Sequence, residues 1–262
     1  MQRLVVEGNY VAGSLVSLNA EQSHFVRDVM RMRAGERIWL TNGIGDEGQA
    51  QIESISREGV VVVVESMERS KREASICVTV GQGMPKADKL EMVIQKCTEL
   101  GAVAIWPLEC ARSIAQIDAK KEARKLERWN KIALEAAEQS HRAFVPNVSP
   151  PQSLKTLVKV MNQFDAVFIA AEVIGHRADS SEHGLRNALA TFRSSLDNEL
   201  DNRALQILIL VGPEGGWTDA EVELLTQAGA VAVGLGNRIL RTETAALVAL
   251  SAIYYEFGEY GG

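Results

Sequence analysis

Cysteine is scarce in this chain of 262 residues, and its few copies follow no ligand or disulfide pattern. The three cysteines, Cys77, Cys97 and Cys110, are an odd number and include no CxxC pair. Because a disulfide framework needs paired cysteines and a zinc knuckle needs closely spaced ones, the sequence argues against both. We therefore expect reduced cysteines with structural roles, and no metal site.

Long apolar runs are also lacking. Runs such as Val60–Val64 and Ile207–Val211 fall far short of the roughly 20 residues that a membrane-spanning helix needs. We therefore expect no transmembrane segment and no membrane partner. Residues 1–7 do not combine a basic region with a long apolar core, so a signal peptide is not predicted and a cytoplasmic location is expected.

The composition is otherwise that of an ordinary folded protein, with 46% apolar and 24% charged residues, which excludes disordered and collagen-like classes. The formal net charge is −6, and an acidic protein is a poor candidate for nonspecific binding to nucleic acid. Positive charge is nevertheless concentrated locally. The two basic clusters comprise Arg27, Arg31, Arg33 and Arg37 near the start, and Lys120, Lys121, Arg124, Lys125, Arg128 and Lys131 in the middle.

Residues 1 to about 70 show strand patterns joined by turns, which predicts a first domain that is a small β-barrel or sandwich. The dipeptide Asn42-Gly43 readily adopts the positive φ angles of a tight turn and separates two strand patterns. Apolar residues at helical spacing from His24 to Met32 predict one helix in this domain. The expected strands are 38–40, 48–54 and 60–64.

The charged segment Glu65–Glu73 lacks an apolar face, so we place the domain linker there and expect a second domain over residues 74–262. In this second domain, continuous apolar strands alternate with amphipathic helices, which predicts an α/β fold with a parallel sheet. The expected strands are 76–80, 103–106, 166–170, 207–211 and 231–235. The expected helices are 89–100, 119–140, 219–228 and 243–257.

Two unusual loops follow strands of the predicted sheet. Gly212–Gly216 contains three glycines and a proline, and leads to Thr218 and Glu221, which form a capping-box pattern for the next helix. The second loop, Gly234–Arg241, is followed by Thr242 as the expected helix cap. Both loops are expected at the carboxyl edge of the strands, where ligands bind in open α/β sheets.

Neither loop matches a phosphate-binding motif. The P-loop requires a lysine after its last glycine, and the Rossmann fingerprint requires a third glycine, which both loops lack. Leu235, Ile239 and Leu240 lie among glycines and would suit a flat base and a ribose held by backbone groups. The loops are therefore compatible with a nucleoside ligand without phosphates, and a plain turn is the alternative for either loop.

These two segments also carry a resemblance to a known family. Leu210–Gly216, with the sequence LVGPEGG, and Leu235–Ala245, with the sequence LGNRILRTETA, resemble the C-terminal signature of the small-subunit ribosomal RNA uridine-N3 methyltransferases, the RsmE-type branch of the SPOUT superfamily. Asn237 departs from the proline that is frequent in that family. The resemblance extends to His24–Arg33 with Gly35, Lys89–Gly101, Pro107, and Glu138–Arg142 with Val145-Pro146.

The resemblance implies an N-terminal PUA-like β-barrel that helps to bind RNA, and a C-terminal SPOUT α/β domain whose chain forms a deep trefoil knot. It further implies a homodimer that methylates N3 of a uridine in 16S ribosomal RNA, within small ribosomal subunits, with S-adenosylmethionine as the cofactor. The cofactor pocket that the resemblance implies comprises Ala171, Glu172, Leu210, Gly212, Glu214, Gly216, Leu235, Gly236, Ile239, Leu240 and Thr242.

Uracil carries a proton on N3 at neutral pH, so the enzyme must assist its removal or stabilise the resulting anion on O2 and O4. We expect Arg241 or Arg238 to face the uracil and stabilise this charge, with Glu243 orienting the arginine. The alternative is an ion pair that only fixes the loop.

The candidate RNA contacts are His24, Arg27, Arg31 and Arg33 in the first domain, and His141 and Arg142 after the long basic helix. The three arginines would form a phosphate-binding edge. A solvated helix face is the alternative for them, a structural role is the alternative for His24, and a helix-end cap is the alternative for the His141-Arg142 pair.

Two other functions are compatible with the sequence. A binding module without catalysis would share the basic clusters but would not need both glycine-rich loops. Methylation of a ribose 2′-hydroxyl, which other SPOUT proteins carry out, would need the same loops and differ in its product. Titration with S-adenosylmethionine and S-adenosylhomocysteine distinguishes the binding module from an enzyme. The methylated nucleoside distinguishes methylation of the ribose from methylation of the base.

Overall fold

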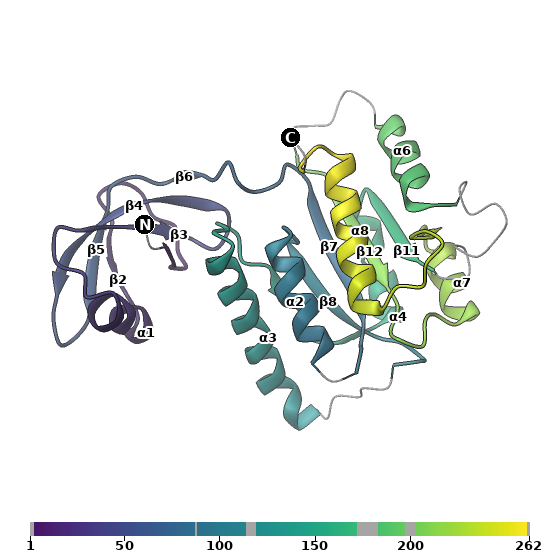
Figure 1. Cartoon of the computed structure of the whole chain (residues 1–262), viewed down its shortest axis with the longest axis horizontal. Helices are drawn as coiled ribbons and strands as arrows, with labels where there is room; N and C mark the ends of the chain where they lie inside the picture. Colours follow the sequence, from purple (N-terminus) through teal and green to yellow (C-terminus); the bar gives the residue numbers. More distant parts are fainter. Residues whose placement is uncertain (1–2, 87, 114–118, 172–182, 197–202, 261–262) are drawn as a thin grey trace. The chain divides into compact units, whose positions relative to one another are not determined.

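The computed structural model describes residues 3–86, 88–113, 119–171, 183–196 and 203–260. By its internal contacts the chain forms two compact units (Figure 1). The first unit contains Met1–Glu73 and also Ala137–Val145, and the second contains Ala74–Ala136 and Pro146–Gly262. The sequence did not indicate that residues 137–145 join the first unit.

The first unit is built on a six-stranded sheet in the order β1-β3-β4-β5-β2, with β6 paired to β4. Its pairs are antiparallel except for β1 and β3, and the buried positions of β5 alternate with half-buried ones, as in a strand with one face on a core. In the described residues no pairing between β1 and β2 closes the sheet. The strands are β1 Arg3–Val5, β2 Leu15–Ser17, β3 Arg37–Thr41, β4 Asp46–Ile55, β5 Val60–Val64 and β6 Glu68–Arg69.

The predicted helix is present in the first unit but its bounds differ. Helix α1 spans Ala20–His24 and continues as the π-helix η1, Phe25–Val29. A capping box between Asn19 and Gln22 starts the helix four residues before the predicted position. The helix ends before Arg31, whose φ of 54° is incompatible with a right-handed helix, so Arg31 and the residues after it lie outside it.

The segment that was predicted as a linker is instead part of the first unit. Glu68 and Arg69 form β6, and the Ser70 hydroxyl donates a hydrogen bond of 2.7 Å to the Glu47 carboxylate. Arg72 Nη1 lies 3.0 Å from the same carboxylate. Polar side chains of this segment therefore bind the buried Glu47 carboxylate. These contacts explain why a segment without an apolar face is still ordered.

Residues 137–145 are attached to the first unit by hydrogen bonds. The Glu73 carboxylate accepts from Arg142 Nη2 at 2.8 Å and from the backbone N–H groups of Ala143 and Phe144 at 2.8 and 3.0 Å. The Val145 N–H donates to the carbonyl of Gly43 at 2.9 Å. This strand-like contact explains why the segment after the long helix groups with the first unit.

The second unit has a parallel sheet in the order β10-β8-β7-β12-β11-β13, with β9 paired to β8, as the alternating pattern predicted. Its strands are β7 Cys77–Gly83, β8 Ala104–Glu109, β9 Asn147–Val148, β10 Gln152–Ser153, β11 Ala166–Ala170, β12 Gln206–Val211 and β13 Val231–Val233. Its helices are α2 Lys89–Glu99, α3 Ala119–Gln139, whose last residues belong to the first unit, α4 Leu154–Val158, η2 Met161–Gln163, α6 Leu185–Ser195, α7 Asp219–Gln227 and α8 Thr242–Glu256.

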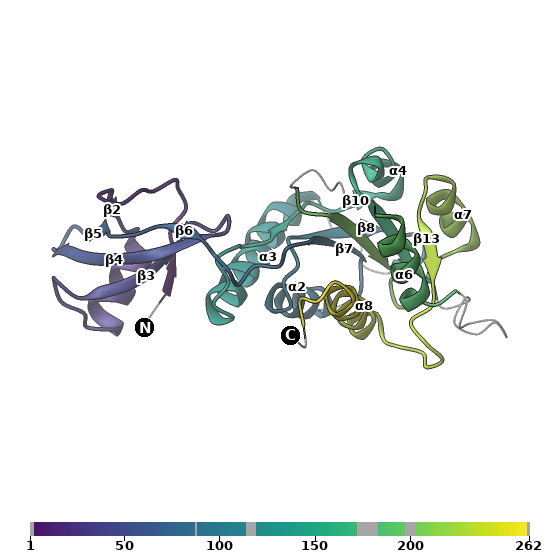
Figure 2. The same ribbon diagram turned by 90° about the horizontal axis from the view of Figure 1, so that it is seen from above.

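Helices cover both faces of this sheet (Figure 2). Along β12, Ile207 and Ile209 pack in the core beneath α2, α6 and α8, whereas Leu208 and Leu210 pack with α4 and α7. Burial of alternate residues on opposite faces explains why the strand is a continuous apolar run. The arrangement leaves the loops after the strands at one edge of the sheet.

The three cysteines are free thiols. Cys97 lies in the core on the inner face of α2, as its place on the apolar side of the helix predicted, and burial raises the pKa of its thiol to about 12. Among the helices of the described residues, none combines the length and the apolar character needed to cross a bilayer.

Candidate active site

A cavity of about 680 Å³ lies at the carboxyl edge of the parallel sheet, enclosed by the two glycine-rich loops and the end of β11. This volume is typical of a site for a small molecule or a cofactor. Nine of the eleven residues assigned to the cofactor line it, as do Arg238 and Arg241. The nine are Ala171, Gly212, Glu214, Gly216, Leu235, Gly236, Ile239, Leu240 and Thr242.

The other two assigned cofactor residues are placed differently. Leu210 does not line the cavity, because its side chain is buried in the core shared with α4 and α7. Glu172 lies outside the described residues.

The first loop is fixed by glycines and by contacts from β7. The N–H of Gly216 donates to the carbonyl of Pro213 at 2.8 Å, and Gly216 has a left-handed φ of 68° that favours glycine. A Cβ on Gly83 would lie 2.6 Å from the Pro213 ring, so β7 approaches the loop as closely as a backbone can. Beyond the loop, the predicted capping box between Thr218 and Glu221 starts α7.

Thr242 joins the second loop to the first. Its hydroxyl donates to the carbonyl of Gly212 at 2.5 Å and accepts from Gln82 Nε2 at 2.7 Å. Thr242 is therefore not the N-cap of α8, as the sequence pattern suggested. Arg241 occupies the N-cap position, with extended backbone angles and no capping hydrogen bond from its side chain. The Thr242 hydroxyl binds the neighbouring loop, so it does not cap the helix.

Arg238 and Arg241 are exposed at the cavity, and in the part of the chain that the structure describes neither guanidinium has an ion-pair or hydrogen-bond partner. The expected pairing of an arginine with Glu243 is not present among the residues that the structure describes. Glu243 is 8% exposed, and its carboxylate lies 3.3 Å from the ammonium of Lys89. Among the described residues Glu243 therefore pairs with a lysine that the sequence pattern did not single out, and not with either arginine.

Three further groups at the cavity were missed by the sequence reasoning. Lys89 starts α2, and Arg112 follows β8 and donates through Nη1 to the carbonyls of Gly215 and Trp217 at 3.0 and 3.1 Å. The Trp217 indole donates to the carbonyl of Ala170 at 3.0 Å. All three residues come from loops or helix ends at the carboxyl edge of the sheet. Arg112 could have been predicted from the sequence, because it lies in the segment after a predicted strand of the parallel sheet.

One face of α7 also lines the cavity. The residues that contribute are Asp219, Val222, Glu223 and Thr226, at the spacing of a single helical face. This face adds the carboxylates of Asp219 and Glu223 to that of Glu214 in the cavity lining.

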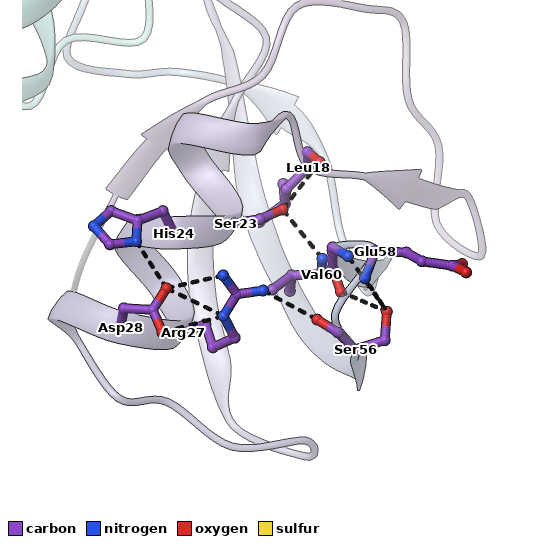
Figure 3. A network of polar contacts seen from close by, with 9 residues as sticks. Leu18, Ser23, His24, Arg27, Asp28, Ser56, Glu58 and Val60 are labelled. Atoms are coloured by element: carbon purple, nitrogen blue, oxygen red, sulfur yellow. Dashed lines mark hydrogen bonds and ion pairs between the residues drawn. The ribbon is translucent and has the colours of Figure 1, made fainter.

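In the first unit, the candidate RNA contacts near the π-helix form a network of polar contacts (Figure 3). His24 Nδ1 lies 2.7 Å from Asp28 Oδ2, and Arg27 Nη2 donates to the same oxygen at 2.9 Å. Arg27 also donates to the carbonyl of Ser56 at 3.0 Å. Hydrogen bonding from Arg27 lowers the pKa of Asp28, so this carboxylate compensates the arginine at neutral pH.

The remaining candidate RNA contacts divide by burial. Arg31 and Arg33 are both exposed, and within the described residues their guanidinium groups have no partner. His141 is exposed in a left-handed conformation with φ 59°. Arg142 is buried, with a side chain that is 7% exposed and paired to Glu73, so it does not present its charge to a nucleic acid.

Both units match known protein families. Residues 72–254 match a family described as an RNA methyltransferase domain, and residues 18–65 match an RNA methyltransferase PUA domain. The chain is 44% identical to a Bacillus subtilis protein named ribosomal RNA small subunit methyltransferase E, over 92% of this chain and 90% of that protein. A protein of the same name from Synechocystis is 34% identical over 96% of this chain and 76% of its own length.

Solved structures give the same result. A Neisseria gonorrhoeae ribosomal RNA small subunit methyltransferase E bound to S-adenosylmethionine has a TM-score of 0.78, with 28% identity over 97% of both chains. A putative methyltransferase from Legionella pneumophila in complex with the same cofactor has a TM-score of 0.77, with 31% identity over 97% of this chain and 96% of that chain.

Proposed function

This chain belongs to the family of RNA methyltransferases that includes ribosomal RNA small subunit methyltransferase E, and we propose that it methylates N3 of a uridine in 16S ribosomal RNA. It has the PUA domain and the parallel-sheet methyltransferase domain of that family, and S-adenosylmethionine is its methyl donor. The uridine, the position N3 and the residues that act on it are the proposal.

The observation that carries the proposal is the cavity that both glycine-rich loops enclose. Gly212, Gly216 and Gly236 expose backbone groups to it, and Leu235, Ile239 and Leu240 supply apolar surface. Such a lining suits a nucleoside bearing a sulfonium, because its ribose and base need backbone partners and a flat apolar face. Glu214 and Thr242 add the polar groups that would orient it.

The bound cofactor would supply an electrophilic methyl group, which an acceptor lone pair in line with the sulfur–carbon bond can take. The protein must therefore align the acceptor nitrogen and assist the loss of its proton. Arg238 and Arg241 line the cavity with guanidinium groups that have no partner in the described residues. Their donors would stabilise the negative charge that develops on O2 and O4 of the uracil. Glu243 holds Lys89 instead of an arginine, so its proposed part in catalysis is indirect.

RNA recognition by the first unit is proposed to depend on Arg31 and Arg33, because their charges are uncompensated in the described residues. Exposed His141 would add a third contact. His24 and Arg27 would contribute less, since both already bind Asp28. The buried Arg142 is removed from the proposed RNA contacts.

A homodimer in the cytoplasm, with assembled small subunits as its substrate, completes the proposal. Helix α8 is rich in apolar residues, and it leaves Val248 and Tyr255 exposed, at 40% and 70%. Large apolar side chains exposed on one helix can mark an interaction surface, which supports a second copy as the cover. A monomeric mass in sedimentation at micromolar concentration would contradict the dimer.

The test is transfer of a tritiated methyl group to small subunits from a strain that lacks the enzyme, followed by identification of the nucleoside. We expect 3-methyluridine. A methylated ribose would replace the proposal by 2′-O methylation, and absence of transfer together with cofactor binding would indicate a binding module.

The arginine variants test the mechanism in the same assay. Arg241→Ala is expected to lower kcat about 100-fold, because loss of one donor to a developing oxyanion typically costs that much, while cofactor affinity changes little. Lys155→Ala, an exposed residue on α4, is the matched control. Full turnover by both Arg241→Ala and Arg238→Ala would remove the arginines from the mechanism.

A further inference from the structure

Lys89 pairs with two carboxylates at the cavity, those of Glu214 and Glu243. It is the first residue of α2, and its ammonium lies 3.1 Å from Glu214 and 3.3 Å from Glu243. Glu214 belongs to the first glycine-rich loop, and Glu243 lies in the first turn of α8, directly after the second loop. One side chain from a third element therefore connects the two loops.

Lys89 and Glu214 each favour the charged form of the other. Hydrogen bonding to Glu214 and Glu243 raises the pKa of Lys89. Burial alone would raise the pKa of Glu214, but hydrogen bonds from its own N–H, from the N–H of Lys86 and from Lys89 lower it below its ordinary value. The Lys86 N–H donates to Glu214 at 3.0 Å, so the start of α2 holds this carboxylate at two points.

Glu243 depends on Lys89 more strongly than Glu214 does. Glu243 is almost fully buried, and its Oε2 atom accepts no well-aligned hydrogen bond. Within the described ranges Lys89 is the only group that pairs with this carboxylate. Without the Lys89 ammonium, the buried Glu243 carboxylate would face the Glu214 carboxylate with no cation between them. Removal of one partner from a buried ion pair is strongly unfavourable.

A second connection between the loops is neutral. The Thr242 hydroxyl donates to the carbonyl of Gly212, next to the residues that Lys89 holds. This hydrogen bond fixes the distance between the loops at one point, and the Lys89 contacts fix it at another. Two points of attachment determine the angle between the loops as well as their separation, and thus the shape of the cavity.

We propose that Lys89 is a positioning residue for methyl transfer, whose ammonium holds Glu214 and Glu243 together and so sets the spacing of the two loops around the cofactor. The inference rests on the proposed function, because it assigns the cavity to the methyl donor. The other cations that line the cavity, Arg112, Arg238 and Arg241, make no contact with either carboxylate in the described residues, and Asp219 and Glu223 belong to α7.

The experiment compares Lys89→Met with Lys96→Met in the full-length protein. Lys96 lies on the same helix, is similarly half exposed and pairs with Glu99 of its own helix, so it controls for loss of a lysine and of an ion pair. Affinity for S-adenosylmethionine and S-adenosylhomocysteine is measured by calorimetry, stability by thermal unfolding without ligand, and kcat and KM by methyl transfer.

We expect Lys89→Met to weaken the binding of both cofactor forms by about tenfold or more, since displacement of a positioned group by about 1 Å can cost up to about 100-fold. Lys96→Met should stay within about twofold of the wild type. Lys89→Arg should restore most of the affinity, because a guanidinium can bridge the same carboxylates. Lys89→Met/Glu243→Gln should bind more tightly than Lys89→Met, since the double variant lacks the like-charge pair.

The result that overturns the inference is a Lys89→Met variant with the affinity of Lys96→Met, whether or not its unfolding temperature falls. If Lys89→Met does not fold, Lys89→Gln takes its place, and unchanged affinity there is equally decisive. A wild-type protein that binds no cofactor would refute the proposed function itself, and the inference with it. Wild-type binding and turnover with unaffected Lys89 variants would refute the inference alone.

Discussion

Arginines of this chain have different roles because their environments differ. Arg142 is buried against Glu73, whereas Arg33 has no partner for its guanidinium in the described residues. From the sequence, both arginines were expected to contact RNA, because a sequence gives the residue type but not the partner of its side chain. Burial and pairing make Arg142 a residue that stabilises the fold, and leave Arg33 available to a phosphate.

This contrast makes a prediction for two matched substitutions. Arg142→Met should lower the free energy of unfolding by about 3 kcal/mol or more, because it leaves the Glu73 carboxylate buried without its cation. Arg33→Met should leave stability nearly unchanged, weaken RNA binding, and reduce the slope of log affinity against log salt by about one. Chemical denaturation and RNA binding at several salt concentrations measure these effects. Loss of the salt slope in Arg142→Met at full stability would reverse the assignment.

Helix ends explain where sequence reasoning about single elements was accurate. The Thr218–Glu221 capping box placed the start of α7 correctly, because the cap is formed by residues three apart in the sequence. The cap of α8 was misplaced, because the Thr242 hydroxyl binds a carbonyl 30 residues away. The start of α1 was missed although Asn19 and Gln22 form the same local pattern.

Two glycines of β7 provide a test of how strands shape the site. A Cβ on Gly83 would lie 2.6 Å from the ring and the backbone nitrogen of Pro213, whereas a Cβ on Gly81 would lie 2.6 Å from a methyl group of Leu210. A leucine methyl can rotate away, but Pro213 can move only with its loop. We expect Gly83→Ala to weaken cofactor binding at least about tenfold, and Gly81→Ala to cost about 1–3 kcal/mol of stability at nearly normal affinity.

Calorimetry with S-adenosylmethionine and thermal unfolding measure the two glycine variants. Equal loss of affinity in both would mean that the strand as a whole, and not its contact with the loop, sets the shape of the cavity. Normal affinity in Gly83→Ala would show that the loop adapts to the added methyl group.

At the scale of the whole molecule, the first unit is discontinuous in sequence. Residues 137–145 supply partners for Glu73, Gly43 and Gly45 through backbone N–H and carbonyl groups. The family matches place the PUA domain within residues 18–65 and the methyltransferase domain within 72–254, so this segment lies inside the latter match. A single domain boundary in the sequence therefore separates residues 137–145 from the residues of the first unit to which they are hydrogen-bonded.

A fragment of residues 1–73 should accordingly be much less stable than the first unit of the intact chain. Without residues 137–145 the Glu73 carboxylate loses four hydrogen bonds, which come from Arg142, Ala143 and Phe144. We expect the fragment to unfold at a lower denaturant concentration, and a fragment with residues 137–145 joined by a flexible linker to recover. Circular dichroism during urea unfolding measures this, and equal midpoints would contradict the role of the segment.

The sequence by itself determined the local features of this protein. Apolar periodicity predicted a parallel α/β domain after a strand-rich domain, and this architecture is confirmed. Glycine spacing predicted the two loops, because a chain that must turn tightly or approach a ligand needs glycine at specific positions. The trefoil knot and the cofactor residues stay predictions, although the loops that carry most of those residues do line one cavity.

Only the tertiary structure decided which charges are paired and which are free. Lys89 lies 125 residues from Glu214 and 154 residues from Glu243 along the chain, yet its ammonium lies 3.1 and 3.3 Å from their carboxylates. Electrostatic interactions depend on distance through space and on burial, and neither quantity is periodic in the sequence. The same reason explains why the sequence could name Glu243 as important and still assign it the wrong partner.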